Sequence, residues 1–187
     1  MNPISFTASY KTSAVIQARR GDSFNPVQAY IVEIDKNNAE DLNSLHKVSR
    51  LWNKENSNLM SYMLADFIQD LDLKPDVNEN HCLILTTQKD NFENIDPQKV
   101  LGAMLFSEEN MENELNWLQV QPKYNSKFKP VSRRYKGVGT ALVSYLKAKF
   151  TDKPIYVYSS NTAIDFYKKL GFNTYDDKYP CSMYYEA

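Results

Sequence analysis

The chain has 187 residues, of which 42% are hydrophobic and 13% aromatic, a composition typical of a globular domain with its own core and not of a disordered chain. Its formal net charge is −1, so no overall field draws it to nucleic acid or to an anionic membrane. No apolar run approaches the ~20 residues of a membrane helix, and residues 1–10 lack the pattern of a secretory signal. We therefore expect one cytoplasmic domain over residues 1–187, a monomer or homodimer, with no membrane or nucleic-acid partner.

Cysteine and histidine are too scattered to indicate a metal centre. Cys82 and Cys181 lie far apart and form neither a CxxC pair nor a Cys/His cluster. We predict two reduced thiols and no metal. His46 and His81 are interpreted as packing residues on a helix face and a strand.

The first third of the chain predicts β structure followed by two helices. Residues 4–18 are β-prone and indicate one or two strands, residues 21–22 and 25–26 are predicted breaks, and residues 27–35 alternate as a strand does. A helix capped by Asn38 should follow, with Leu42, Leu45, Val48 and Trp52 on its buried face. A second helix, capped by Ser57 or Asn58, has apolar residues at helical spacing: Met60, Met63, Leu64, Phe67, Ile68 and Leu71.

The remaining elements alternate between strand and helix patterns. Strands are predicted at 81–87, 99–107, 114–122, 154–160 and 183–185. Helices are predicted from Gly137, with a period of 3.6, and over 162–172, where Gly171 ends the helix. Several consecutive strands with helices inserted early and late indicate an α+β or α/β sheet covered by helices.

Residues 134–140 combine an arginine with two glycines, RxxGxGT, between a predicted strand and a predicted helix. Glycines let the backbone approach a ligand, and the free amides and positive dipole end of the following helix suit phosphate. The letters match neither a P-loop nor a dinucleotide fingerprint, because there is no GK[ST] and Leu142 stands where a third glycine is needed. Taken alone, the stretch is equally compatible with an ordinary loop-to-helix turn.

Two further segments give this turn a context. The strand end "LQVQP" (118–122) precedes it, and the strand–helix block "IYVYSSNTAIDFYKKLGF" (155–172) follows it. In this order the three pieces, within residues 99–172, resemble the GNAT superfamily of acyl-CoA-dependent N-acetyltransferases. The resemblance implies an α+β fold with a mixed, mostly antiparallel sheet of six to seven strands and about four helices, with acetyl-CoA as cosubstrate. Residues 1–25 match nothing in the family and are treated as an N-terminal β elaboration.

The resemblance also implies roles for residues. The pyrophosphate of coenzyme A would lie on the turn, and its pantetheine arm would pair with the strand and contact the last helix. The implied cofactor-binding residues are Leu118, Gln119, Val120, Arg133, Arg134, Tyr135, Lys136, Gly137, Val138, Gly139, Thr140, Asn161 and Phe166. Tyr167 aligns with the family's general acid. Asn161 either contacts the pantetheine or caps its helix.

A carboxylate near the start of the strand could accept the acceptor's proton, with Glu114 the first candidate and Glu112 the second. The sequence departs from the family pattern in a basic insertion at 123–132, and Asn161 lies one residue closer to Tyr167 than in the usual motif. The insertion could contact the 3′-phosphate of coenzyme A, shape the acceptor cleft, or simply be a solvated loop.

The expected function is transfer of an acetyl group from acetyl-CoA to a primary amine of a small molecule or peptide, by direct attack in a ternary complex. Two alternatives stay open. One is a non-catalytic acyl-CoA-binding module. The other is an acetyltransferase acting on charged tRNA or a protein N-terminus, which the basic residues of 123–136 suggest and the overall charge disfavours.

Overall fold

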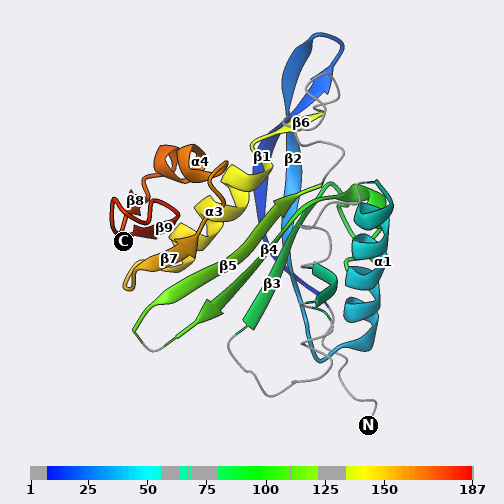
Figure 1. Cartoon of the computed structure of the whole chain (residues 1–187). Helices are drawn as coiled ribbons and strands as arrows, with labels where there is room; N and C mark the ends of the chain where they lie inside the picture. Colours follow the sequence, from blue (N-terminus) through cyan, green and yellow to red (C-terminus); the bar gives the residue numbers. More distant parts are fainter. Residues whose placement is uncertain are drawn as a thin grey trace.

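A single nine-stranded sheet organises the described part of the chain in the computed structural model (Figure 1), which describes residues 8–55, 64–66, 68, 80–109, 111–121 and 134–186. The strand order is β6-β1-β2-β3-β4-β5-β7-β9-β8, and every neighbouring pair is antiparallel except β5 and β7. The mixed α+β class is confirmed. The predicted six to seven strands are too few, since β6 (Tyr135–Lys136) and β8 (Asn173–Thr174) are too short to show an alternating pattern.

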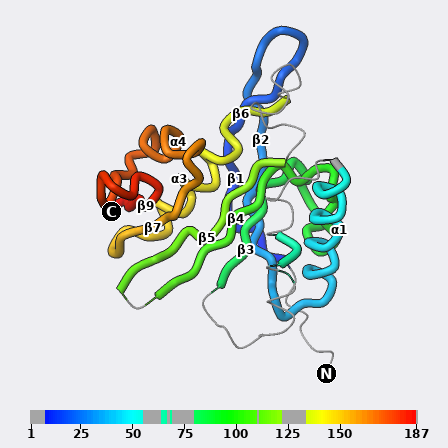
Figure 2. The backbone as a smooth tube through the Cα atoms, viewed as in Figure 1, coloured from blue at the N-terminus to red at the C-terminus, as the bar shows by residue number. Residues whose placement is uncertain are grey.

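The N-terminal elaboration is a long hairpin. β1 (Ser9–Arg20) and β2 (Ser23–Ile34) pair along their lengths around a turn at Gly21 and Asp22, and the far end of the hairpin projects beyond the other strands (Figure 2). The predicted break at 25–26 is wrong, because β2 runs through Pro26. Pairing with β3 begins only at Tyr30, so among the strands that the structure describes β2 has only β1 beside it at Pro26. The missing N–H of a proline is tolerated at such an edge.

Helix α1 (Ala39–Glu55) covers one face of the sheet. The Asn38 side chain accepts hydrogen bonds from the amides of Glu40 and Asp41, which confirms the predicted cap. Leu45, Val48 and Trp52 of α1 are buried against β2, β3 and β4. Of the predicted second helix, Leu64 and Ile68 are helical and buried in the same core, and the other named positions, its caps included, lie outside the described residues.

The central strands are β3 (Asn80–Thr86), β4 (Val100–Glu108) and β5 (Asn113–Val120), with a short 3-10 helix (Pro97–Lys99) before β4. Helix α3 (Val138–Lys149) packs on the face opposite α1. Its residues Val138, Leu142, Val143 and Leu146 are buried there. The sheet therefore separates two hydrophobic cores.

The C-terminal strands extend the sheet beyond β5, and the helix between them packs on the α3-side core. β7 (Ile155–Tyr158) is followed by the short helix α4 (Ile164–Lys169), β8 and β9 (Ser182–Tyr185). Both cysteines are free, as predicted. Among the described residues, no helix combines the length and hydrophobicity required to cross a membrane.

A row of charged side chains crosses one end of the sheet. The Glu33 carboxylate accepts from Lys11 Nζ at 2.6 Å and lies 2.6 Å from His81 Nδ1. His81 Nε2 lies 3.3 Å from Glu108 Oε1, which also pairs with Lys149 of α3. The hydrogen bond with His81 is the main cause that lowers the pKa of Glu33 to about 2. The His81 ring also stacks on Phe106 at a centroid distance of 4.8 Å, which confirms its predicted packing role on the strand.

Candidate active site

The two parallel strands separate soon after they meet. β5 pairs with β7 only at Asn113–Leu115, opposite Ile155–Val157, and then runs on to Val120 without β7 beside it. Figure 1 shows the two strands diverging toward their C-terminal ends. Among the described strands, none pairs with the main-chain groups of residues 116–120 on that side, which makes the segment an edge that an extended ligand can pair with.

A β-bulge at Asn116 marks the point of separation. The register with β4 shifts there, because Leu105 faces Trp117 while Phe106 faces Leu115. The shift changes which side chains share a face: Leu115, Leu118 and Val120 contact the α3-side core, whereas Trp117 lies in the α1-side core. Among the described residues, Trp117 Nε1 and Gln119 Oε1 are buried without a hydrogen-bond partner, so this stretch of β5 carries unsatisfied polar groups.

The glycine-rich turn forms the N-terminus of α3. Gly137 is the N-cap with φ of 85°, a conformation that an L side chain rarely adopts. The first helical bond runs from Ala141 N to Gly137 O at 2.8 Å. The amides of residues 138–140 precede that bond and have no helical partner. They lie at the positive end of the helix dipole, an arrangement suited to an anion.

The N-terminal hairpin holds this turn in place, a role that sequence analysis missed. The two residues of β6 pair with Gln17 and Ala18 of β1, and Arg19 N donates to Arg134 O at 2.7 Å. The available signal was the Gly-Asp dinucleotide between two β-prone runs, which is typical of a two-residue hairpin turn. This dinucleotide predicts a hairpin, but it does not indicate which further strand the hairpin pairs with.

Three predicted site residues from separate segments meet beside the turn. A β-carbon at Gly139 would lie 3.2 Å from Phe166 Cζ and 3.7 Å from Leu118 Cδ2. The absence of a side chain at Gly139 thus lets α3 approach both α4 and β5. Gly102 of β4 permits a similar approach underneath, since a β-carbon there would lie only 2.7 Å from Val138 Cγ1. The turn at the N-terminus of α3 therefore lies next to residues 116–120 of β5, the part of the strand that β7 does not pair with.

Tyr167 lies on α4 and is buried in the α3-side core. Its side chain is 5% exposed, and its ring makes edge contacts with Phe166 and Phe172 at centroid distances of 5.0 and 5.4 Å. Burial raises the pKa of the Tyr167 phenol above its ordinary value of 10. The group is therefore protonated throughout the neutral range and is available there as a proton or hydrogen-bond donor.

Asn161 does not cap α4. The N-cap is Ala163, which makes no side-chain cap bond, and the side-chain oxygen Oδ1 of Asn161 accepts a hydrogen bond from Cys181 Sγ at 2.9 Å. The capping interpretation is wrong because residues 159–163 separate β7 from α4, which leaves Asn161 two positions before the N-cap. The alternative role of Asn161, contact with pantetheine, stays a prediction.

The other predicted residues are placed less centrally. Arg134 is exposed, with its guanidinium carbon 5.8 Å from the centre of the Tyr135 ring, and the Lys136 ammonium lies 3.7 Å from the centre of the Phe24 ring. Glu114 is exposed on β5 and faces Tyr156 of β7 in register, and Glu112 is exposed just before the strand. Arg133 and the insertion 123–132 lie outside the described residues.

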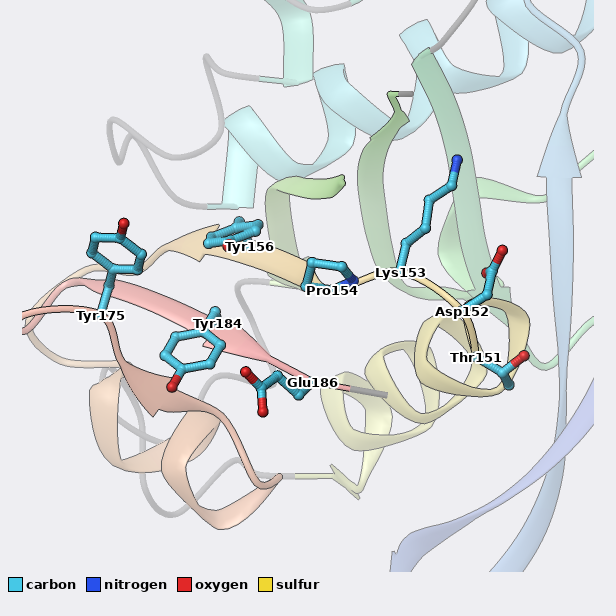
Figure 3. Close-up of a pocket in the computed structure, with 8 residues that line it drawn as sticks. All are labelled: Thr151, Asp152, Lys153, Pro154, Tyr156, Tyr175, Tyr184 and Glu186. Atoms are coloured by element: carbon cyan, nitrogen blue, oxygen red, sulfur yellow. The ribbon is translucent and has the colours of Figure 1, made fainter. Parts of the chain in front are cut away.

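Two hollows border this region. One, of about 680 Å³, runs between α3 and β1 and reaches Gly137 and Thr140 of the turn. The other, of about 580 Å³, lies where β7 begins and β9 ends (Figure 3). The α3–β1 hollow extends the space available to a ligand bound at the turn.

Comparison with known proteins yields structural matches only. No family model and no curated protein sequence matches the chain. An acetyltransferase from Thermus thermophilus superposes with a TM-score of 0.55 and 17% identity, over 84% of this chain and 94% of that one. A putative GNAT-family acetyltransferase from Desulfovibrio desulfuricans gives 0.50 and 13%, over 82% and 94%. The PaiA N-acetyltransferase of Thermoplasma acidophilum, solved with coenzyme A, gives 0.48 and 16%, over 86% and 100%.

Proposed function

We propose that this chain, which has the fold of the GNAT acetyltransferases, transfers the acetyl group of acetyl-CoA to an amine. One observation carries the proposal: Leu118, Gly139 and Phe166 converge, so the open edge of β5 lies against the N-terminus of α3. That arrangement offers a phosphate site and an extended-chain site side by side. A long ligand with a pyrophosphate at one end and an amide-containing arm requires both.

The residues present fit such a ligand. The amides of Val138, Gly139 and Thr140 would hold the pyrophosphate, with Gly137 allowing close approach. The main chain of β5 from Leu118 to Val120 would pair with the amides of the pantetheine arm, as an added strand does. Arg133, Arg134, Tyr135 and Lys136 are proposed as flanking contacts, Asn161 and Phe166 as contacts with the arm.

Acyl transfer from this ligand requires the acceptor nitrogen to form a bond to the thioester carbonyl carbon while the carbon–sulfur bond breaks. The nitrogen loses a proton and the sulfur gains one. Tyr167 is the proposed donor on the sulfur side. Burial raises its pKa and keeps the phenol protonated at neutral pH, so its proton is available to the departing sulfur, and the phenolate left behind regains a proton from solvent. A main-chain amide of the open β5 segment would stabilise the negative charge on the carbonyl oxygen.

On the acceptor side we propose Glu114 as the proton acceptor, directly or through water, with Glu112 as the second candidate. Glu114 pairs with Tyr156, and the next pair, Leu115 with Val157, is the last before β5 and β7 separate, so Glu114 lies beside the opening between these strands. It is exposed and therefore accessible to a bound amine. The acceptor site would lie on the sheet face turned away from α3.

A paired substitution at Thr140 tests the phosphate site. Thr140→Pro removes one amide N–H that makes no helical bond, in the first turn where proline is tolerated, and Thr140→Ala removes the exposed side chain but keeps the N–H. A charge-assisted hydrogen bond contributes about 1.5–3 kcal/mol, so acetyl-CoA affinity should fall tenfold or more in Thr140→Pro only. Isothermal titration measures both, with circular dichroism to confirm folding.

The wild-type chain supplies the other outcomes. Absence of acetyl-CoA and CoA binding would refute the proposal. Binding without turnover over a broad amine panel would instead indicate a non-catalytic acyl-CoA-binding module. Acetylation of an amine, detected by mass spectrometry, would support the enzyme.

A further inference from the structure

The hollow at the start of β7 is lined by three tyrosines from separate segments (Figure 3). Tyr156 lies on β7, Tyr184 on β9, and Tyr175 follows β8. Each of the three ring pairs has a centroid separation of 6.3 Å. The rings thus form a triangle, although the residues are up to 28 positions apart in the chain.

Strand register explains why these rings share a face. Ile155 and Val157 are buried in the α3-side core, so Tyr156 between them points to the opposite face of the sheet. Tyr184 pairs with Tyr156 on one side and Glu114 pairs with it on the other. Glu114, Tyr156 and Tyr184 therefore form a row across three strands on the face away from α3.

The surroundings of the triangle are acidic. Asp152 and Glu186 line the hollow, Glu114 of β5 faces Tyr156, and Glu112, just before β5, is close enough to act on the Tyr156 hydroxyl. In the part of the chain that the structure describes, no ion pair involves any of these four carboxylates. The lysine of the lining, Lys153, donates from Nζ to the Glu109 carbonyl at 3.1 Å.

The field of these carboxylates acts on the rings. Burial is the first cause that raises the pKa of Tyr156, and the carboxylates of Glu112 and Glu186 raise it further. Tyrosine faces carry negative π charge and attract ammonium groups, and nearby carboxylates strengthen that attraction. A hollow with both features selects a cation and disfavours an anion.

The hollow also lies next to the proposed acceptor site. The Glu114–Tyr156 pair is followed by one more pair before β5 and β7 separate. Two strand residues span about 7 Å, so the opening begins about that far from the tyrosines. A single small molecule can reach both places.

We propose that the triangle of Tyr156, Tyr175 and Tyr184 is a subsite for a second, positively charged ammonium group of the acceptor. The inference rests on the proposed acetyl transfer and narrows its substrate to diamines, polyamines and other amines that carry an additional cationic group. The rings hold the charged group while the amine at the far end of a short alkyl chain lies at the opening between β5 and β7.

The first test measures cation binding without any chemistry. Tetramethylammonium should bind the wild-type chain saturably in an NMR titration, and neopentyl alcohol, of similar size but neutral, should not. Tyr184→Leu keeps an apolar side chain and removes one ring, so tetramethylammonium affinity should fall about threefold to thirtyfold. Tyr179→Leu is the matched control, because Tyr179 is an exposed tyrosine on the same tail, at 65%, and does not line the hollow.

The second test asks whether the hollow serves the acceptor. With acetyl-CoA present, cadaverine should have a higher kcat/KM than pentylamine, which lacks the second ammonium group. Tyr184→Leu should reduce that preference through KM, and Tyr179→Leu should retain it.

The outcomes separate the two proposals. If the wild-type chain does not bind tetramethylammonium, the cation subsite is refuted, even if acetyl-CoA binds and neutral amines are acetylated. If tetramethylammonium binds but cadaverine has no preference, the hollow is not an acceptor subsite. Failure to bind acetyl-CoA refutes the proposed function instead, and the tetramethylammonium titration still reports on the hollow.

Discussion

Replacing Gly102 by alanine should displace the first turn of α3, and should therefore lower both the stability of the fold and the affinity for acetyl-CoA. The added β-carbon would lie 2.7 Å from Val138 Cγ1, 3.3 Å from Gln119 O and 3.3 Å from Leu142 Cδ1. Carbon atoms pack best at about 3.5–4.0 Å, so Val138 must retreat by about 1 Å. A valine in a helix has one strongly preferred rotamer, which means that the backbone of the first turn has to move with the side chain.

The expected cost follows from this overpacking. Extra methyl groups in a well-packed core destabilise by about 1–3 kcal/mol, and each kcal/mol lowers Tm by about 2–4 °C in a chain of this size. Displacing the amides of residues 138–140 by about 1 Å weakens charge-assisted hydrogen bonds, so acetyl-CoA affinity should fall about tenfold.

Thermal unfolding and isothermal titration measure the two effects. Ile84→Val is the matched control, since Ile84 is buried in the α1-side core. Removing one methylene group there should lower the free energy of unfolding by about 0.5–1.5 kcal/mol without affecting α3. An unchanged acetyl-CoA affinity in a destabilised Gly102→Ala variant would contradict the assignment of the α3 turn to coenzyme A. An unchanged Tm would contradict the packing argument itself.

Three more predictions concern single residues. Tyr167→Phe should lower kcat while leaving CoA affinity within about twofold, because it removes a donor from a ring that stays packed, and equal activity in steady-state assays would exclude Tyr167 from the mechanism. The hydrogen bond with His81 lowers the pKa of Glu33 from 4.5 to about 2, so the ionised carboxylate stabilises the fold above pH 4.5 and this stabilisation is lost as pH falls through about 2. Glu33→Gln should therefore lower the free energy of unfolding by about 2–3 kcal/mol at pH 7. Urea titrations should show that this difference vanishes near pH 2. A thiol reagent should label Cys181 in the native chain and Cys82 only after unfolding, because Cys82 is buried and burial raises the pKa of its thiol; labelling of both at equal rates would contradict this burial.

Local signals in the sequence were sufficient for most elements. Asn38 caps its helix as predicted, because the cap is decided by a side chain within three residues of the amides it binds. The glycine turn before α3 was likewise predicted from one short segment, but those residues alone did not distinguish a phosphate site from an ordinary turn. The Asn161 cap failed where two extra turn residues separated the side chain from the helix.

Contacts between distant segments were decided only by the tertiary structure. The alternating pattern of residues 114–122 fixed a strand but not the bulge at Asn116, which depends on the register with β4. The pairing of β1 with β6 could not be deduced, because a two-residue strand leaves no periodic pattern.

By itself, the sequence determined the α+β elements, the two free cysteines and the segments able to form an anion turn and an extended edge. The tertiary structure decided that Leu118, Gly139 and Phe166 meet, and that Tyr156, Tyr175 and Tyr184 line one hollow. The physical reason is that periodicity reports which face of a strand or helix is buried, whereas the order of strands in a sheet arises from long-range pairing that no local pattern encodes.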